Sequence, residues 1–127
     1  MAKNILIIDD EELITKTLQK LLKKQGYGVT IAQSGNEALE KVKKQEFDLI
    51  VCDVRMPEMD GVETVKEIRN YLKEQGKQSI PEVFITGYAD EEKYKNAVKL
   101  KVADYIYKPF DREEFLAVIR RNLGVSG

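Results

Sequence analysis

Short apolar runs alternate along the chain with longer segments in which apolar residues recur every three or four positions. The short runs predict β-strands, because they are rich in β-branched and aromatic residues and are bounded by Gly, Pro or charged residues. The longer segments predict amphipathic helices with Lys and Glu on their outer faces. This alternation favours a parallel sheet covered by helices, and five strand–helix units fit the chain.

The expected strands are residues 4–8, 29–32, 48–52, 82–86 and 104–107. The first and third contain few polar residues, so we expect both of their faces to be buried. An apolar stripe of helical spacing follows each strand: Ile14, Leu18, Leu21 and Leu22; Ala38, Leu39 and Val42; Val65, Ile68 and Leu72; Tyr94, Ala97 and Val98; Phe115, Val118, Ile119 and Leu123.

Two helix starts carry a capping signal. Ser34 and Asp111 are each followed three residues later by an acid, a spacing typical of helix N-caps. Gly26, Gly28 and Gly76 mark connections between elements. We therefore expect one open α/β domain over residues 1–127, with a core of about residues 3–123.

Composition narrows the function classes. The 21 basic and 22 acidic residues give a net charge of -1, so no global field favours nucleic acid or an anionic membrane surface. Apolar runs are far shorter than the roughly 20 residues that span a bilayer, and the N-terminus lacks a signal-peptide pattern. We therefore predict a cytoplasmic protein that binds neither nucleic acid nor membrane directly.

Histidine is absent, and Cys52 is the only cysteine. The lack of histidine removes histidine-based acid–base catalysis, histidine metal ligands and a phosphodonor histidine within this sequence. A single cysteine excludes a disulfide framework and a cysteine zinc site, and its apolar neighbours predict a buried side chain. Chemistry must therefore use oxygen ligands and lysine.

Ligands of doubly wound sheets bind beyond the carboxyl ends of the strands. Asp9 and Asp10 follow the first predicted strand, and Asp53, Thr86 and Lys108 lie at the ends of the third, fourth and fifth. Three carboxylates suit a hard divalent cation, with Mg²⁺ the best fit, while a hydroxyl and an ammonium group suit an anion. Each residue alone has an ordinary explanation as a helix cap, loop acid, strand residue or solvated charge. Their joint placement at one edge predicts a site.

These residues resemble those of the receiver domain of two-component response regulators, of which the chemotaxis-type receiver is the nearest structural example. The resemblance covers essentially the whole chain. It implies a single-domain flavodoxin-like (βα)5 fold, doubly wound, with a five-stranded parallel sheet in the order 2-1-3-4-5. It is carried by Asp9-Asp10-Glu11, Asp53-Val54-Arg55-Met56-Pro57-Glu58-Met59-Asp60-Gly61, Thr86, Tyr105 and Lys108-Pro109-Phe110.

The resemblance implies that Asp53 accepts a phosphoryl group in a Mg²⁺-dependent reaction. Asp10, Asp53 and the backbone carbonyl of Arg55 would ligate Mg²⁺, and Asp9 would act mainly through a metal-bound water. Thr86 would then hydrogen-bond to the phosphoryl group.

Further implied roles concern the fifth strand and the switch. Lys108 would pair with the phosphoryl group, helped by a cis bond to Pro109, and Tyr105 would swing inward as Thr86 moves. The surface of the fourth helix, fifth strand and fifth helix would change and carry the signal. The domain would not be an enzyme beyond its own phosphorylation and dephosphorylation.

The implied partners are a sensor histidine kinase or phosphotransfer protein as donor, and a downstream protein or missing output domain as target. A homodimer through the switching surface stays open as well. Two alternatives remain: a non-phosphorylated interaction module of the same fold, and an aspartyl-phosphate phosphohydrolase. The second is disfavoured because Arg55 stands where such enzymes carry a second Asp.

The chain also departs from the common pattern of the family. Gly87 follows Thr86 where the family usually has alanine, and the bulky Tyr88 comes next. Tyr88 and Arg55 occupy positions that influence the lifetime of the phosphoryl group in the family, so this lifetime is left open. Lys101 and Val102 stand before the fifth strand, so the fourth helix is expected to end without a glycine cap.

Overall fold

The computed structural model describes residues 2–56, 59–87, 95 and 97–123. Five strands pair in parallel in one sheet, in the predicted order β2-β1-β3-β4-β5. The chain runs through β1 (Asn4–Ile8), α1 (Glu12–Lys24), β2 (Gly28–Ala32), α2 (Gly35–Lys44), β3 (Leu49–Asp53), α3 (Gly61–Glu74), β4 (Glu82–Gly87), β5 (Asp104–Lys108) and α5 (Arg112–Leu123).

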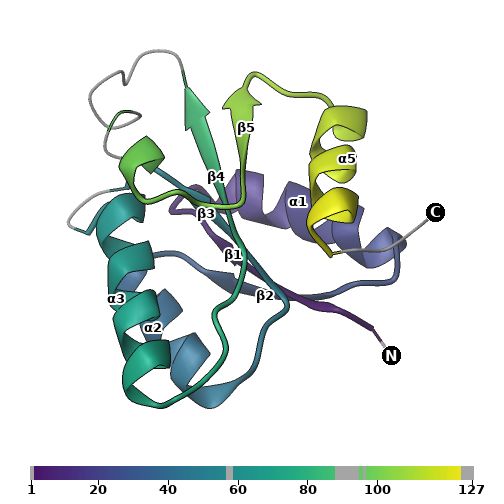
Figure 1. Ribbon diagram of the computed structural model, residues 1–127. Helices are drawn as coiled ribbons and strands as arrows, with labels where there is room; N and C mark the ends of the chain where they lie inside the picture. The colour runs from purple at the N-terminus through teal and green to yellow at the C-terminus, as the bar shows by residue number, and fades with distance from the viewer. Residues whose placement is uncertain (1, 57–58, 88–94, 96, 124–127) are drawn as a thin grey trace.

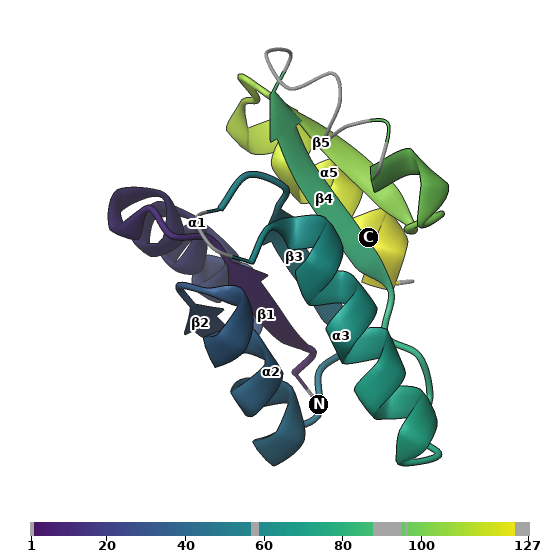
Figure 2. The same cartoon turned by 90° about the vertical axis from the view of Figure 1, so that its left-hand side faces the viewer.

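Helices cover both faces of the sheet, as the doubly wound fold requires (Figure 1). α1 and α5 pack on one face, whereas α2 and α3 lie side by side on the other, as the view in Figure 2 also shows. Alternate strand residues divide between the two cores. Ile5, Val51 and Ile85 point toward α1 and α5, whereas Leu6, Cys52 and Phe84 point toward α2 and α3.

The central strands are buried on both faces, which confirms the prediction from their apolar runs. In β3 every residue is buried, and in β1 all but Asn4 are. Cys52 is also fully buried. Because neighbouring elements cover these strands completely, the polar residues that follow them stand at the edge of a rigid frame.

The third strand begins one residue later than the sequence pattern suggests. The pattern predicts Asp48 as its first residue, but Asp48 Oδ2 accepts a hydrogen bond from the Asn4 N–H at 2.8 Å. A side chain that satisfies a neighbouring backbone group competes with the strand ladder, so the strand starts at Leu49. The second strand starts one residue earlier than predicted, at Gly28.

Both predicted helix caps are present. Ser34 Oγ accepts the Glu37 N–H at 3.1 Å, and Asp111 Oδ1 accepts the Glu114 N–H at 2.8 Å. The predicted fourth helix is described at residues 95 and 97–99, and Tyr94 lies outside the described residues. Lys101 follows this turn with a φ of 53°, so the turn ends in left-handed backbone without glycine, as expected.

In the part of the chain that the structure describes, no helix has the length and apolar character needed to cross a membrane.

Candidate functional site

The first part of the site follows β1. Asp9 is 0% exposed; its backbone N–H donates to the Ala32 carbonyl at 3.0 Å, and its Oδ1 accepts the Glu11 N–H at 3.0 Å. Its Oδ2 is buried and has no hydrogen-bond partner among the described residues. The next residue, Asp10, is exposed. A buried carboxylate oxygen without a partner is costly unless a cation, water or another donor satisfies it.

Asp53 is the last residue of β3 and is 3% exposed. Its Oδ1 accepts the Arg55 N–H at 3.2 Å, and its Oδ2 lies 3.4 Å from Lys108 Nζ. The latter distance is at the long end for a hydrogen bond, so Lys108 acts mainly as a nearby positive charge. One Asp53 oxygen is thus oriented by a backbone N–H and the other lies beside the Lys108 ammonium group.

Thr86 and Lys108 reach the same edge because β4 and β5 are parallel neighbours. Ile85 is paired with Asp53 across β3 and β4, and Gly87 is paired with Lys108 across β4 and β5. Thr86 is 3% exposed, and its hydroxyl oxygen has no hydrogen-bond partner in the described structure. The Lys108–Pro109 peptide bond is cis, as the resemblance implied.

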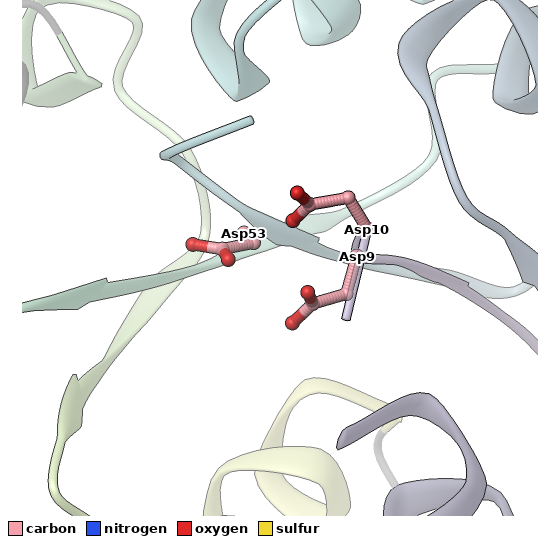
Figure 3. Close-up of side chains that lie close together, drawn as sticks. All are labelled: Asp9, Asp10 and Asp53. Carbon is pink, nitrogen blue, oxygen red and sulfur yellow. The ribbon is translucent and has the colours of Figure 1, made fainter. Parts of the chain in front are cut away.

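The three acids form a compact cluster. One carboxylate oxygen from each of Asp9, Asp10 and Asp53 lies within 4.8 Å of the others (Figure 3). Three carboxylates repel one another at this separation unless a positive charge lies among them. Oxygen ligands, a buried oxygen lacking a partner and an exposed third acid together fit a small hard cation such as Mg²⁺.

Burial perturbs the two enclosed acids. It raises the pKa of Asp9 to about 6, against the opposing effect of the Glu11 N–H, and the charge of Asp53 adds to the increase. Burial also raises the pKa of Asp53, with Lys108 the main opposing influence. Without a cation, the fold therefore makes both carboxyl groups easier to protonate than in water, and a bound cation would oppose this effect.

Tyr105 lies on the same face of β5 as Tyr107, and the two rings stack with centroids 6.3 Å apart. The Tyr105 hydroxyl donates to the Ala97 carbonyl at 3.3 Å, which links β5 to the helical turn before it. Its role as a switch stays a prediction, as does metal ligation by the Arg55 carbonyl. Pro57, Glu58 and Tyr88, which the sequence analysis also considered, lie outside the described residues.

Two neighbours of the site received no specific role from the sequence. Asp60 is the N-cap of α3, with its Oδ1 accepting the Glu63 N–H at 3.0 Å. Gly61 packs so closely that a Cβ there would overlap the Asp53 carbonyl oxygen and Val54 Cα. In the sequence, Asp60 directly before Gly61 and the apolar stripe that follows could have predicted a capped helix start beside Asp53.

Comparisons with known proteins agree with this geometry. The profile of the response regulator receiver domain family matches residues 5–120. The transcriptional regulatory protein ZraR of Escherichia coli K12 is 41% identical over 120 residues, which are 94% of this chain and 26% of that protein. CrdR of Helicobacter pylori, also a transcriptional regulatory protein, is 37% identical over 95% of this chain and 55% of its own length.

Solved structures give the same result at the level of the fold. The chemotaxis protein CheY4 of Vibrio cholerae superposes with a TM-score of 0.85 at 32% identity, covering 97% of this chain and 100% of CheY4. A CheY-like receiver domain protein of Methanospirillum hungatei gives a TM-score of 0.86 at 28% identity, covering 98% of this chain and 95% of that one. Because the family profile spans almost the whole sequence and the strand order is shared, the chain belongs to the response regulator receiver domain family of two-component signalling.

Proposed function

We propose that Asp53 accepts a phosphoryl group in a reaction that depends on Mg²⁺. The observation that carries the proposal is the convergence of three carboxylates beside Lys108, with a buried oxygen of Asp9 and the hydroxyl of Thr86 both lacking a partner in the described structure. The acids suit a cation, whereas the hydroxyl and the ammonium group suit an anion. A site that can bind a cation and an anion side by side suits the transfer of a phosphoryl group to Asp53 with Mg²⁺ bound.

Mg²⁺ would be held by Asp9, Asp10 and Asp53 together with the carbonyl of Arg55, and Asp9 would contribute mainly through a bound water. When bound, Mg²⁺ neutralises charge on the phosphoryl oxygens. The buried position of Asp53 at the end of β3 would fix the direction from which its attacking oxygen meets the phosphorus atom.

In the transfer, an oxygen of Asp53 forms a bond to phosphorus as the bond from phosphorus to the donor breaks. With a phosphohistidine donor, the electron pair of the P–N bond returns to the imidazole nitrogen, which then takes up a proton. Lys108, 3.4 Å from Asp53, balances negative charge on the transferring group. The donor is external to this sequence, which contains no histidine, and a sensor histidine kinase or phosphotransfer protein supplies it.

The phosphorylated Asp53 would draw Thr86 toward it, because the acyl phosphate carries more negative charge than the carboxylate it replaces and adds strong acceptor oxygens. Thr86 has a hydroxyl to donate, and movement toward the phosphoryl group leaves space that Tyr105 can enter. Tyr105 then exchanges its bond to Ala97 for a new position, which alters the surface of β5, α5 and the preceding helical turn.

This surface would regulate a downstream partner. ZraR and CrdR are named transcriptional regulatory proteins, and the chain spans 26% and 55% of their respective lengths. These relatives support an output domain in the same polypeptide, and a separate target protein or a homodimer through this surface are the alternatives.

The test is the intact mass of the protein after incubation with acetyl phosphate, with and without Mg²⁺. The parent should gain one phosphoryl mass only with Mg²⁺, and Asp53→Asn should gain none. Asp48→Asn serves as a matched control, because it makes the same substitution just before β3, at the opposite end of the strand from Asp53, and the amide oxygen can still accept the Asn4 N–H. Failure of the parent to bind either phosphoryl or beryllofluoride would favour a constitutive interaction module instead.

A further inference from the structure

Arg69, on α3, joins three separate parts of the fold. Its Nε and Nη2 donate to the two carboxylate oxygens of Glu82 at 2.9 and 2.7 Å, and its Nη1 donates to the Leu100 carbonyl at 2.8 Å. Glu82 is the first residue of β4, and Leu100 ends the helical turn before β5. One guanidinium group therefore connects α3, the start of β4 and the connection that leads into β5.

The ion pair is well enclosed. The Glu82 side chain is 7% exposed and that of Arg69 is 34% exposed, so water screens the pair less than it would on an open surface. The planar fork of the guanidinium matches both carboxylate oxygens, which fixes its orientation and directs its third nitrogen at the Leu100 carbonyl. Arg69 is thus held by Glu82 in the position in which it caps the turn.

The C-terminal end of this turn lacks a glycine cap, so its last carbonyl group needs a hydrogen-bond donor from elsewhere in the fold. Lys101 has a φ of 53°, in a region that glycine adopts readily and a residue with a Cβ does not. The Leu100 carbonyl lies beyond the last bonds of the turn, in which Leu100 and Lys101 donate to Ala97 and Val98. The bond from Arg69 satisfies this carbonyl and holds the turn in place.

The same turn holds the predicted switch residue. Ala97, three residues before Leu100, accepts the hydrogen bond from the Tyr105 hydroxyl. At the other end of α3, Gly61 lies against the backbone of Asp53. The helix α3 therefore contacts the proposed phosphorylation site through Gly61 and, through Arg69, the turn to which the Tyr105 hydroxyl is hydrogen-bonded.

We propose that Arg69 is a latch that holds the turn at residues 97–101, and with it Tyr105, in the arrangement of the unphosphorylated protein. The inference rests on the proposed function, because it concerns the change of surface that follows phosphorylation. A contact made only in the resting arrangement opposes the switched one by the free energy of that contact. Loss of the latch should therefore favour the switched arrangement before any phosphoryl group is present.

The test compares the affinity of the parent and of Arg69 variants for beryllofluoride in the presence of Mg²⁺, by titration calorimetry. Arg69→Lys keeps a positive charge near Glu82, but its single nitrogen cannot reach both Glu82 oxygens and the Leu100 carbonyl, and the variant should bind beryllofluoride several-fold more tightly than the parent. Complete loss of the latch in Arg69→Met/Glu82→Met should increase affinity roughly tenfold, because hydrogen bonds from charged groups are worth about that factor or more.

The double variant replaces the pair with apolar side chains of similar length, so no buried carboxylate is left unpaired. It therefore keeps the test valid if Arg69→Lys folds poorly. Arg120→Met is the control for lost charge, since this guanidinium donates to Gln25 on the surface at 3.2 Å. Hydrogen exchange of the Leu100 and Lys101 amides should be faster in both latch variants than in the parent and the control.

The outcomes separate the two proposals. If the parent binds beryllofluoride and the latch variants bind it with affinities within about twofold of the parent, the latch proposal is wrong and the proposed function stands. A tenfold change in affinity corresponds to about 1.4 kcal/mol, and a twofold change is far smaller than the expected effect. A parent that does not bind beryllofluoride would overturn both. Faster exchange together with unchanged affinity would assign Arg69 a structural role only.

Discussion

Removal of divalent cations should make the free energy of unfolding depend on pH through the pKa of Asp9. This pKa is raised from 3.8 to about 6 in the folded chain, mainly by burial. Between these values the folded state binds more protons than the unfolded state, so stability falls as pH rises through this window. Each pKa unit corresponds to about 1.4 kcal/mol, which gives a loss of about 3 kcal/mol by pH 7 as an upper estimate.

A loss of that size is measurable, because domains of this kind unfold with roughly 5–15 kcal/mol in total. The assay is urea denaturation of the chelated protein between about pH 4.5 and 7.5, repeated with Mg²⁺. Mg²⁺ should remove most of the decline, because a cation takes the place of the proton. Asp53, whose pKa is also raised, contributes in the same direction.

Asp9→Asn separates the titration from other effects, because the amide carries no charge at any of these pH values. Without cations, Asp9→Asn should be more stable than the parent at pH 7.5, and with Mg²⁺ the order should reverse. Glu40→Gln, which removes an exposed acid on α2, should follow the parent under all conditions. Equal stability of the chelated parent at pH 5 and 7.5 would refute the reasoning, as would a slope unchanged in Asp9→Asn.

Two further substitutions test the frame around Asp53. Gly61→Ala should lower the free energy of unfolding by about 2 kcal/mol in urea denaturation, because the added Cβ overlaps backbone atoms of Asp53 and Val54. Gly87→Ala is the control: its added Cβ meets open space, so the free energy of unfolding should change by less than about 0.5 kcal/mol. An equal effect of the two would contradict the packing argument. Lys108→Gln should keep Mg²⁺ binding but slow phosphorylation by acetyl phosphate at least roughly tenfold in the mass assay, since it removes the positive charge beside Asp53; an unchanged rate would exclude Lys108 from the transfer.

Local patterns in the sequence were sufficient to predict the strands, the helix starts and their order along the chain. β1 and β3 are short apolar runs and are buried, and Ser34 and Asp111 cap the helices that they precede. Such features depend on residues within a few positions of one another. The boundary at Asp48 was wrong because its partner, Asn4, lies 44 residues away.

The site itself was partly predictable, for a related reason. Parallel strands place their carboxyl ends at one edge, so Asp9, Asp10 and Asp53 could be expected together once the strands were assigned. Other features of the site depend on how the neighbouring elements pack. They are the distances between these oxygens, the burial that raises the pKa of Asp9, and the lack of a hydrogen-bond partner for the Thr86 hydroxyl in the described structure.

By itself, then, the sequence determined the fold class and the residues available at the edge of the sheet, because periodicity and strand ends are local properties of the chain. Only the tertiary structure decided that Arg69 binds both Glu82 and the Leu100 carbonyl, across separations of 13 and 31 residues. It likewise decided that Tyr105 donates to Ala97 and that Gly61 touches Asp53. Directional hydrogen bonds and close contacts require atoms within a few ångströms, and that proximity arises only when all five strands and their helices pack together.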